Sequence, residues 1–149
     1  MKEYSDPRMH TAEHVLNQTM VRMFGRGRAF SSHIERKKSK CDYRFGRELT
    51  EAEAAELERR VNEVLRSDLP VTAELVPMDK AKAELDLRRL PPEAAGGGLR
   101  VVRVGDYDAC PCIGEHVAST GSIGFFRIVS SSFAAGVLRV RFRLEPPAA

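Results

Sequence analysis

The chain has 149 residues, of which 42% are hydrophobic, and a formal net charge of +3. This length suits one domain with its own core, so we expect a single domain over residues 1–149 in which 144–149 form a loose tail. No run approaches the roughly 18 apolar residues of a membrane span, and no apolar segment follows Lys2 as in a signal peptide. We therefore expect a cytoplasmic protein without membrane contacts. Its 3 cysteines, an odd number, argue against a secreted disulfide framework.

The first expected element is a helix near the N-terminal end. Asp6 can cap it, Pro7 suits its first position and Gly25 can stop it. His10 and His14 stand four residues apart, so they share one face of this helix. The apolar face is formed by four residues at helical spacing: Met9, Leu16, Met20 and Met23.

The next segments predict strands around a basic turn and then a second helix. The stretch HIERKKSKCDYRF, residues 33–45, places apolar side chains at strand-like positions on both sides of the turn. Thr50 and Glu53 form a capping box for a helix that runs to about Ser67, before Pro70. Its apolar positions keep helical spacing: Leu57, Val61 and Leu65.

The remaining elements predict an antiparallel sheet. VTAELVP (71–77) reads as a strand, MDKAKAEL (78–85) as a short helix and LPPEAAGGG as a connection. LRVVRV, GFFRIVSSS and VLRVRFRL are expected to be three strands of one antiparallel sheet, because apolar residues in the last alternate with arginines. The fold class is therefore α+β, with helices packed on a curved antiparallel sheet.

A second chemical motif lies between the first two of those late strands. Cys112 and His116 stand four residues apart, and Gly114 lets the backbone turn so that thiolate and imidazole can approach one ion. Together with His10 and His14 they give the mixture of nitrogen and sulfur ligands that zinc prefers. Cys110 is a spare thiol, interpreted as a small buried residue, an alternative ligand or a pocket wall.

Basic residues gather in two places. Either group can be ordinary solvated surface, but the two together favour nucleic acid as a partner. The first group surrounds the basic turn, and the second recurs at every other residue of the last strand: Arg26, Arg28, Arg36, Lys37, Lys38 and Lys40, then Arg139, Arg141 and Arg143.

These motifs resemble the zinc-dependent editing domain of alanyl- and threonyl-tRNA synthetases and its stand-alone relatives. HTAEHVL is similar to the family's H-x-x-x-H helix, VNEVLRSDLPV to its link from second helix to strand, and RVGDYDACPCIGEHVASTGSIGFFRIVS to its C-x-x-x-H motif and following strand. The resemblance implies a zinc ion at His10, His14, Cys112 and His116. It also implies hydrolysis of the ester that joins a wrong amino acid to tRNA.

The resemblance decides between two interpretations of the first motif. His10, Glu13 and His14 also spell the H-x-x-E-H string of inverted zinc peptidases, which take their third ligand, a glutamate, from another helix of a larger scaffold. Here the partner is a Cys/His pair, which argues against a protease. Glu13 is then either an acceptor that orients a ligand histidine or a solvated residue.

The sequence departs from the family around the expected amino-acid pocket. Alanyl editing domains commonly read C-G-G-T-H, whereas residues 112–116 here read C-I-G-E-H, so Ile113 replaces a glycine and Glu115 a threonine. Arg36 lies near the family's glutamine position. His33 is a further candidate for the pocket. The amino acid removed is expected to be small, with serine the leading candidate; oligomeric state is left open. The alternative function is a non-catalytic, zinc-stabilised tRNA-binding module.

Overall fold

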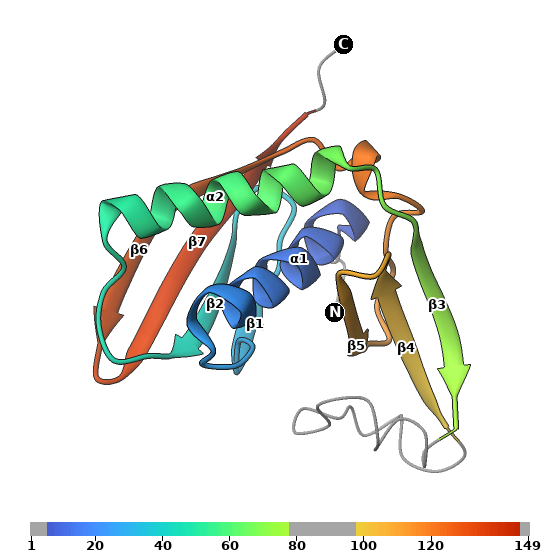
Figure 1. Cartoon of the computed structure of the whole chain (residues 1–149), viewed down its shortest axis with the longest axis horizontal. Helices are drawn as coiled ribbons and strands as arrows, with labels where there is room; N and C mark the ends of the chain where they lie inside the picture. Colours follow the sequence, from blue (N-terminus) through green and yellow to red (C-terminus); the bar gives the residue numbers. More distant parts are fainter. Residues whose placement is uncertain (1–5, 78–97, 147–149) are drawn as a thin grey trace.

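The computed structural model describes residues 6–77 and 98–146 as an α+β fold, in which two helices pack on antiparallel sheets (Figure 1). This confirms the expected fold class. The elements run in the order α1 (Pro7–Phe24), β1 (Ser31–His33), β2 (Ser39–Arg44), α2 (Glu51–Arg66), β3 (Val71–Val76), β4 (Leu99–Val104), β5 (Asp108–Pro111), the 3-10 turn η2 (Thr120–Ser122), β6 (Phe125–Ala134) and β7 (Val137–Glu145).

Both helices begin and end as the sequence predicts. In α1 the Asp6 carboxylate accepts from the backbone of Arg8 and Met9, and Gly25 takes the left-handed conformation at φ 67°. In α2 the Thr50 and Glu53 capping box is formed in both directions. The apolar faces are buried as expected: Met9, Leu16, Met20, Leu57, Val61 and Leu65.

A four-stranded sheet in the order β1-β2-β7-β6 supports the helices. Leu138, Val140 and Phe142 of β7 are fully buried, whereas the arginines between them lie on the opposite face. Asn62 of α2 exchanges two hydrogen bonds with the backbone of Phe126, at 2.9 and 2.7 Å, and so fixes α2 on β6. The strand expected after the basic turn is confirmed as β2, whereas the strand before it, β1, ends at His33 and so lies earlier in the chain than Ile34, where the sequence predicted it.

The remaining strands form a second sheet in the order β3-β4-β5, which corrects one prediction. β4 pairs with β3 and β5, so it does not share a sheet with β6 and β7. The reason is the tight turn after β4, where Tyr107 donates to the carbonyl of Val104 at 2.9 Å and returns the chain alongside β4. β5 itself lies between the first two late strands, where the sequence predicted no strand.

Helix α1 lies between the two sheets (Figure 1). On one side its Asn17 accepts from the Tyr43 hydroxyl of β2 at 2.9 Å, and on the other its Gln18 donates to Asp108 of β5 at 2.9 Å. The helix therefore presents one face to β5 and the loop that follows it, which positions the candidate site.

Some of the predicted segments lie outside the described residues or at their ends. The short helix at 78–85 and most of the connection at 90–98 lie outside the described residues. The strand β7 continues to Glu145, so residues 144 and 145 are not part of a loose tail. Neither α1 nor α2 combines the length and apolar character that crossing a membrane requires.

Candidate metal centre

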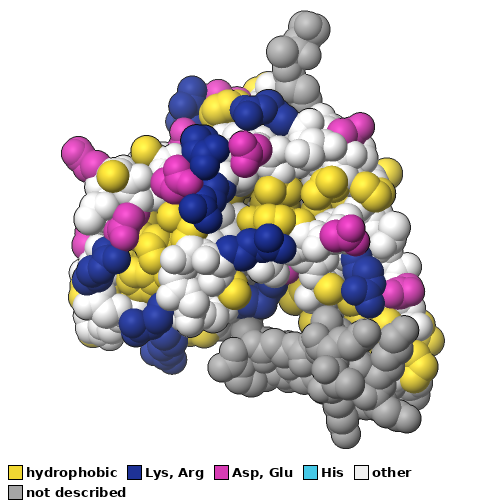
Figure 2. Space-filling view, viewed as in Figure 1, with side chains coloured by type: hydrophobic (Ala, Val, Ile, Leu, Met, Phe, Trp, Pro, Cys, Tyr) yellow, Lys and Arg dark blue, Asp and Glu magenta, His cyan; other side chains and the backbone are white. Residues whose placement is uncertain are grey.

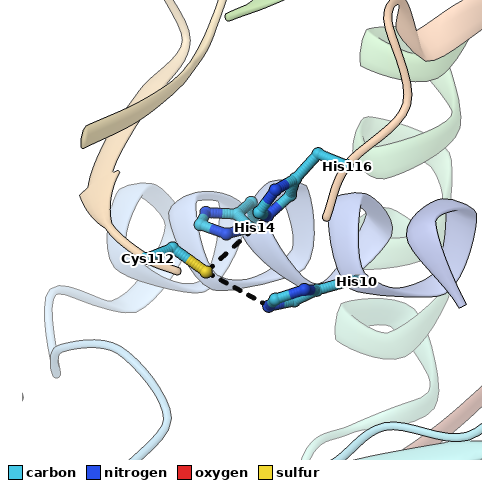
Figure 3. Close-up of side chains that lie close together, drawn as sticks. All are labelled: His10, His14, Cys112 and His116. Carbon is cyan, nitrogen blue, oxygen red and sulfur yellow. Dashed lines mark hydrogen bonds between the residues drawn. The ribbon is translucent and has the colours of Figure 1, made fainter. Parts of the chain in front are cut away.

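Four side chains from the two predicted motifs meet at one point (Figure 3). His10 and His14 come from successive turns of α1, and Cys112 and His116 from the loop after β5. One nitrogen or sulfur atom of each lies within 4.8 Å of the others. This cluster can hold a metal ion, as the spacing of the two motifs predicted.

The two distances from the Cys112 sulfur to ligand nitrogens suit a small tetrahedral ion. The Cys112 Sγ atom lies 3.3 Å from His10 Nε2 and 3.7 Å from His116 Nε2. Bonds of about 2.3 Å to sulfur and about 2.0 Å to nitrogen at a tetrahedral angle would separate these atoms by about 3.5 Å. The donor set of three imidazoles and one thiol is also one that zinc accepts.

A buried carboxylate orients His14. The Asp108 Oδ2 atom lies 3.2 Å from His14 Nδ1, and the carboxylate also accepts from Arg28 at 2.6 and 3.2 Å and from Gln18. The Asp108 side chain is fully buried. Because the carboxylate accepts, Nδ1 of His14 donates, and its Nε2 lone pair is left for a metal.

Charges in the cluster shift its pKa values in the direction that metal binding needs at Cys112. Burial opposes ionisation of this thiol, but hydrogen bonds from His10, His116 and His14 outweigh it and lower its pKa to about 3. Burial likewise opposes the charged form of His14, yet the Asp108 hydrogen bond and the nearby thiols raise its pKa well above the usual value. In the metal-free cluster these shifts favour the thiolate form of Cys112 and the charged form of His14.

Backbone contacts place the loop against the helix. Arg100 donates to the carbonyls of Cys112 and Gly114 at 2.8 and 3.0 Å, and Val117 N donates to Thr11 Oγ1 of α1 at 3.1 Å. A Cβ atom at Gly114 would lie 2.2 Å from Cε1 of His10. Gly114 is thus required for close approach to the His10 ring, which is a more specific reason than the tight turn that the sequence suggested.

His116 differs from His14 in having no outer partner. Its Nδ1 atom is buried and makes no hydrogen bond to any residue that the structure describes. Burial lowers the pKa of this imidazole. The ring is held by its loop rather than by an acceptor, so of the two it is the more easily displaced ligand.

Two further ionisable side chains adjoin the cluster. Glu13 Oε1 lies 3.6 Å from His10 Nε2, with 12% of its side chain exposed. Cys110 lies on β5, two residues after Asp108 and two before Cys112. Its thiol donates to the Pro111 carbonyl at 3.4 Å. Neither belongs to the four-residue cluster.

The predicted pocket residues lie at the surface. His33 is exposed on β1 and forms an ion pair with Glu35. Arg36 is exposed in the basic turn, and Ile113 and Glu115 are exposed in the metal-binding loop, with Ile113 at 55%. Ile113 and Glu115 thus flank the ligands in the loop, whereas His33 is not among the clustered side chains.

The basic residues predicted to bind tRNA occupy the basic turn and the outer face of the four-stranded sheet. Lys40 and Arg141 stand opposite each other on β2 and β7, and Arg141 donates to the hydroxyls of Ser130 and Ser132. Two others have acidic partners: Arg139 binds both carboxylate oxygens of Asp42, at 2.8 and 2.9 Å, and Arg143 pairs with Glu145. Lys37 and Lys38 are exposed.

The region of α2 has a different character. Figure 2 shows basic and acidic side chains interspersed there. Arg59 and Arg60 both pair with Glu56, at 2.8 and 2.6 Å. This balance of charge does not favour a polyanion.

Sequence reasoning missed the residues that hold His14. Asp108, Arg28 and Gln18 are remote from one another in the chain, and none belongs to a ligand motif. One signal was present: Asp108, Cys110 and Cys112 alternate, so a strand there would turn all three toward the same neighbour.

Comparisons with known proteins point to one family. Residues 99–141, which include Cys112 and His116, match the threonyl and alanyl tRNA synthetase second additional domain. The chain is 36% identical to an alanine–tRNA ligase of Treponema denticola over 138 residues, and 37% identical to that of Fervidobacterium nodosum over 142 residues. These alignments cover 91% and 94% of this chain. They confirm the resemblance found in the sequence.

The same alignments cover a small part of each relative. The chain spans 23% of the Treponema protein and 16% of the Fervidobacterium protein. An alanine–tRNA ligase of Bacillus subtilis, 36% identical over 133 residues, is covered over 15% of its length. The similarity is therefore to one segment of these ligases.

Proposed function

Because this chain belongs to the family of alanyl-tRNA synthetase editing-type domains, we propose that it hydrolyses the ester bond of mischarged aminoacyl-tRNA with the help of zinc. The observation that supports this most directly is the convergence of His10, His14, Cys112 and His116 within 4.8 Å. Two motifs about a hundred residues apart, each with ligand spacing, meet in the fold. The proposed setting is the cytoplasm, with tRNA as partner.

The chain's own residues have distinct parts in this proposal. His10, His14 and Cys112 would hold the ion, with His116 as a fourth ligand or close neighbour. Bound zinc lowers the pKa of a water molecule toward about 7 and polarises a carbonyl, which suits attack on an ester at neutral pH. Asp108 keeps the His14 proton on Nδ1, and the displaceable His116 ring offers a way to open a coordination position.

We propose that tRNA lies on the basic turn and the outer face of the four-stranded sheet. Arg36, Lys37 and Lys38 are exposed, and Lys40 and Arg141 continue the positive charge onto β2 and β7. Phosphate contacts supply most of the affinity that a small protein needs for a polyanion. Arg139 and Arg143 share this face but are paired with carboxylates, so we assign them weaker contributions.

The amino acid removed is proposed to be small, with serine first. A synthetase pocket separates amino acids that differ by one methylene or hydroxyl by only about 10- to 200-fold, so a second hydrolytic site is needed. Ile113 and Glu115 stand beside the ligand residues in the loop. A pocket bounded by these two side chains would differ from that of alanyl editing domains.

The test is a deacylation panel. Zinc-loaded protein is incubated with tRNAs charged with Ser, Gly, Ala and Thr, and the release of amino acid is compared with that from His14→Ala at matched folding stability. We expect wild type to deacylate at least one small aminoacyl-tRNA faster. Equal rates for the two proteins on every tRNA would contradict the proposal.

The second candidate is a non-catalytic tRNA-binding module stabilised by zinc. The observation in its favour is that four donor atoms converge, which can saturate a tetrahedral ion and leave no open position. X-ray absorption spectroscopy of the zinc-loaded protein separates the two. Three protein ligands and a water molecule favour the enzyme, whereas four protein ligands together with an inactive panel favour the module.

A further inference from the structure

Two carboxylates adjoin the metal cluster, and their surroundings differ. Asp108 is fully buried and its oxygens accept from His14, Arg28 and Gln18. Glu13, one residue before His14, accepts no hydrogen bond from any residue that the structure describes. Its one ion-pair contact among the described residues is with His10, so of these two carboxylates Glu13 is the one with acceptor capacity left.

Glu13 is nearly enclosed. Its side chain is 12% exposed, and its Oε1 atom lies 3.6 Å from His10 Nε2. The same His10 nitrogen lies 3.3 Å from Cys112 Sγ and is therefore the atom that faces the cluster. A carboxylate with so little contact with water gains from a hydrogen-bond donor, most of all from a charged one.

Metal binding would prevent His10 from donating to Glu13. A ring nitrogen bound to a metal carries no hydrogen, so His10 Nε2 cannot both bind an ion and donate to Glu13. Arg28 also attracts Glu13 electrostatically, but its guanidinium is bound to both oxygens of Asp108. The loaded centre would thus leave the Glu13 carboxylate without a donor from the described residues.

The substrate class brings a group that meets this need. An aminoacyl ester carries an α-ammonium group whose nitrogen lies about 2.5 Å from the ester carbonyl carbon. A divalent ion with three neutral imidazoles and one thiolate keeps a net positive charge, which repels an ammonium beside it. A carboxylate next to a ligand nitrogen, as Glu13 is, would offset that repulsion.

We propose that Glu13 binds the α-ammonium group of the aminoacyl ester and so selects substrates with a free α-amino group. This inference rests on the proposed hydrolysis of aminoacyl-tRNA. Glu13 is in this view a specificity residue: it orients the ester carbonyl toward the cluster through the ammonium group. Glu115, a third carboxylate near the ligands, is exposed and lacks the enclosure that gives an ion pair its strength.

The experiment measures binding rather than turnover. Two stable adenosine analogues are used, each with an amide in place of the 3′-ester: one carries a seryl group, and the other the same group without its α-amino nitrogen. Calorimetry on zinc-loaded wild type should show the amino analogue binding about 10- to 100-fold more tightly, the range of a charge-assisted hydrogen bond. Glu13→Gln, with zinc content checked, should bind the two analogues equally.

The control variant is Glu51→Gln, the same chemical change at an exposed position of α2, which should keep the full preference. If Glu13→Gln does not retain zinc, Glu13→Asp replaces it, and its shorter side chain should reduce the preference. A variant at Glu13 that holds zinc and keeps the wild-type preference overturns the assignment.

The outcomes also separate this inference from the proposed function. Wild type that deacylates tRNA but binds both analogues equally overturns the role of Glu13 alone. Wild type that neither deacylates any tRNA nor binds either analogue overturns both. Both are supported if wild type deacylates tRNA and prefers the amino analogue, and if substitution of Glu13 removes that preference while Glu51→Gln keeps it.

Discussion

The two halves of the candidate metal centre are built in different ways. His10 and His14 stand on consecutive turns of α1, so the helix itself fixes their separation, and Asp108 holds the His14 ring. Cys112 and His116 stand on a loop that reaches the helix through contacts from Arg100 and Thr11. The separation of the helical pair is therefore set by local structure, whereas the position of the loop pair against α1 depends on contacts with residues distant in the sequence.

The comparison is tested most strongly by removing one ligand from each half. Loss of a ligand removes a metal bond outright, so His10→Ala and Cys112→Ala should each lower zinc affinity by more than about 100-fold, the upper end of what outer-shell changes cost. His116→Ala should lose less, because its ring has no outer acceptor among the described residues. Competition with a chelator gives the affinities.

His33→Ala is the matched control, since this exposed histidine lies outside the cluster, and it should retain zinc. Full zinc retention in both His10→Ala and Cys112→Ala would remove the basis for the centre. If His14→Ala and His116→Ala instead lose equal zinc affinity, the hydrogen bond from His14 to Asp108 does not make His14 the stronger ligand.

The support of the helical half is tested at Asp108. Asp108→Ala leaves His14 without an acceptor and Arg28 without its partner, so we expect zinc affinity to fall about 10- to 100-fold. The unpaired Arg28 should also destabilise the metal-free protein by about 3 kcal/mol in urea denaturation. Asp108→Asn keeps an acceptor oxygen and should lose less of both. Asp106→Ala, an exposed carboxylate on the same turn, should change neither.

The approach of the loop to the helix is tested at Gly114. A Cβ atom there would overlap His10 at 2.2 Å, so Gly114→Ala must displace either the ring or the loop. Overpacking costs about 1–3 kcal/mol, which corresponds to a loss of zinc affinity of about 5- to 150-fold if it falls on the bound state. Gly46→Ala meets only Arg26 at 3.9 Å and is the control. Unchanged affinity in Gly114→Ala would show that the loop adjusts freely.

The same contrast explains what could be predicted from the sequence. The spacing of nearby residues was sufficient to predict the helix caps, the apolar faces of α1 and α2, and each ligand pair taken separately. These features depend on residues within a few positions of one another. The donor chemistry and the family resemblance predicted that the two pairs meet. In the structure they lie together.

Features that depend on distant partners were not predicted. Alternation in β4 indicates which side chains are buried, but it does not identify the neighbouring strands, and the three late strands were wrongly expected to share a sheet. Asp108 was overlooked because its partners Arg28 and Gln18 come from other elements. Arg139 was expected to face phosphates, and its pairing with Asp42 depends on the register between β2 and β7.

Removing the metal provides a pH-dependent test. The folded pKa of Cys112, about 3, lies below its unfolded value, so its contribution to stability is complete above the unfolded pKa and is lost as pH falls toward 3. The raised pKa of His14 acts oppositely: its contribution is complete below the unfolded value of about 6.5 and is lost as pH rises through the folded pKa. Between about pH 6.5 and 8.5 the two therefore oppose each other.

Chelated protein should accordingly show a nearly flat urea midpoint from pH 7 to 8 and a falling midpoint from pH 6 to 4. The lowered pKa values of Asp108 and His116 add to the loss on the acid side. Cys112→Ser should reduce the acid dependence. A midpoint that rises on acidification would contradict the thiolate and imidazolium pairing of the metal-free cluster.

The smallest effect is expected away from the centre, in the basic turn, where the proposed tRNA contacts lie. Arg36, Lys37 and Lys38 are exposed, and each phosphate contact adds about 0.7 to 0.9 to the slope of log affinity against log salt. The triple alanine variant should weaken tRNA binding and reduce that slope by roughly 2 to 3 if all three side chains contact phosphate. The matched control replaces Arg59, Arg60 and Arg66 of α2, which removes the same charge from a region of mixed sign. Equal slopes in the two triple variants would assign the basic turn to ordinary solvated surface and leave the outer sheet face, with Lys40 and Arg141, as the remaining candidate contact.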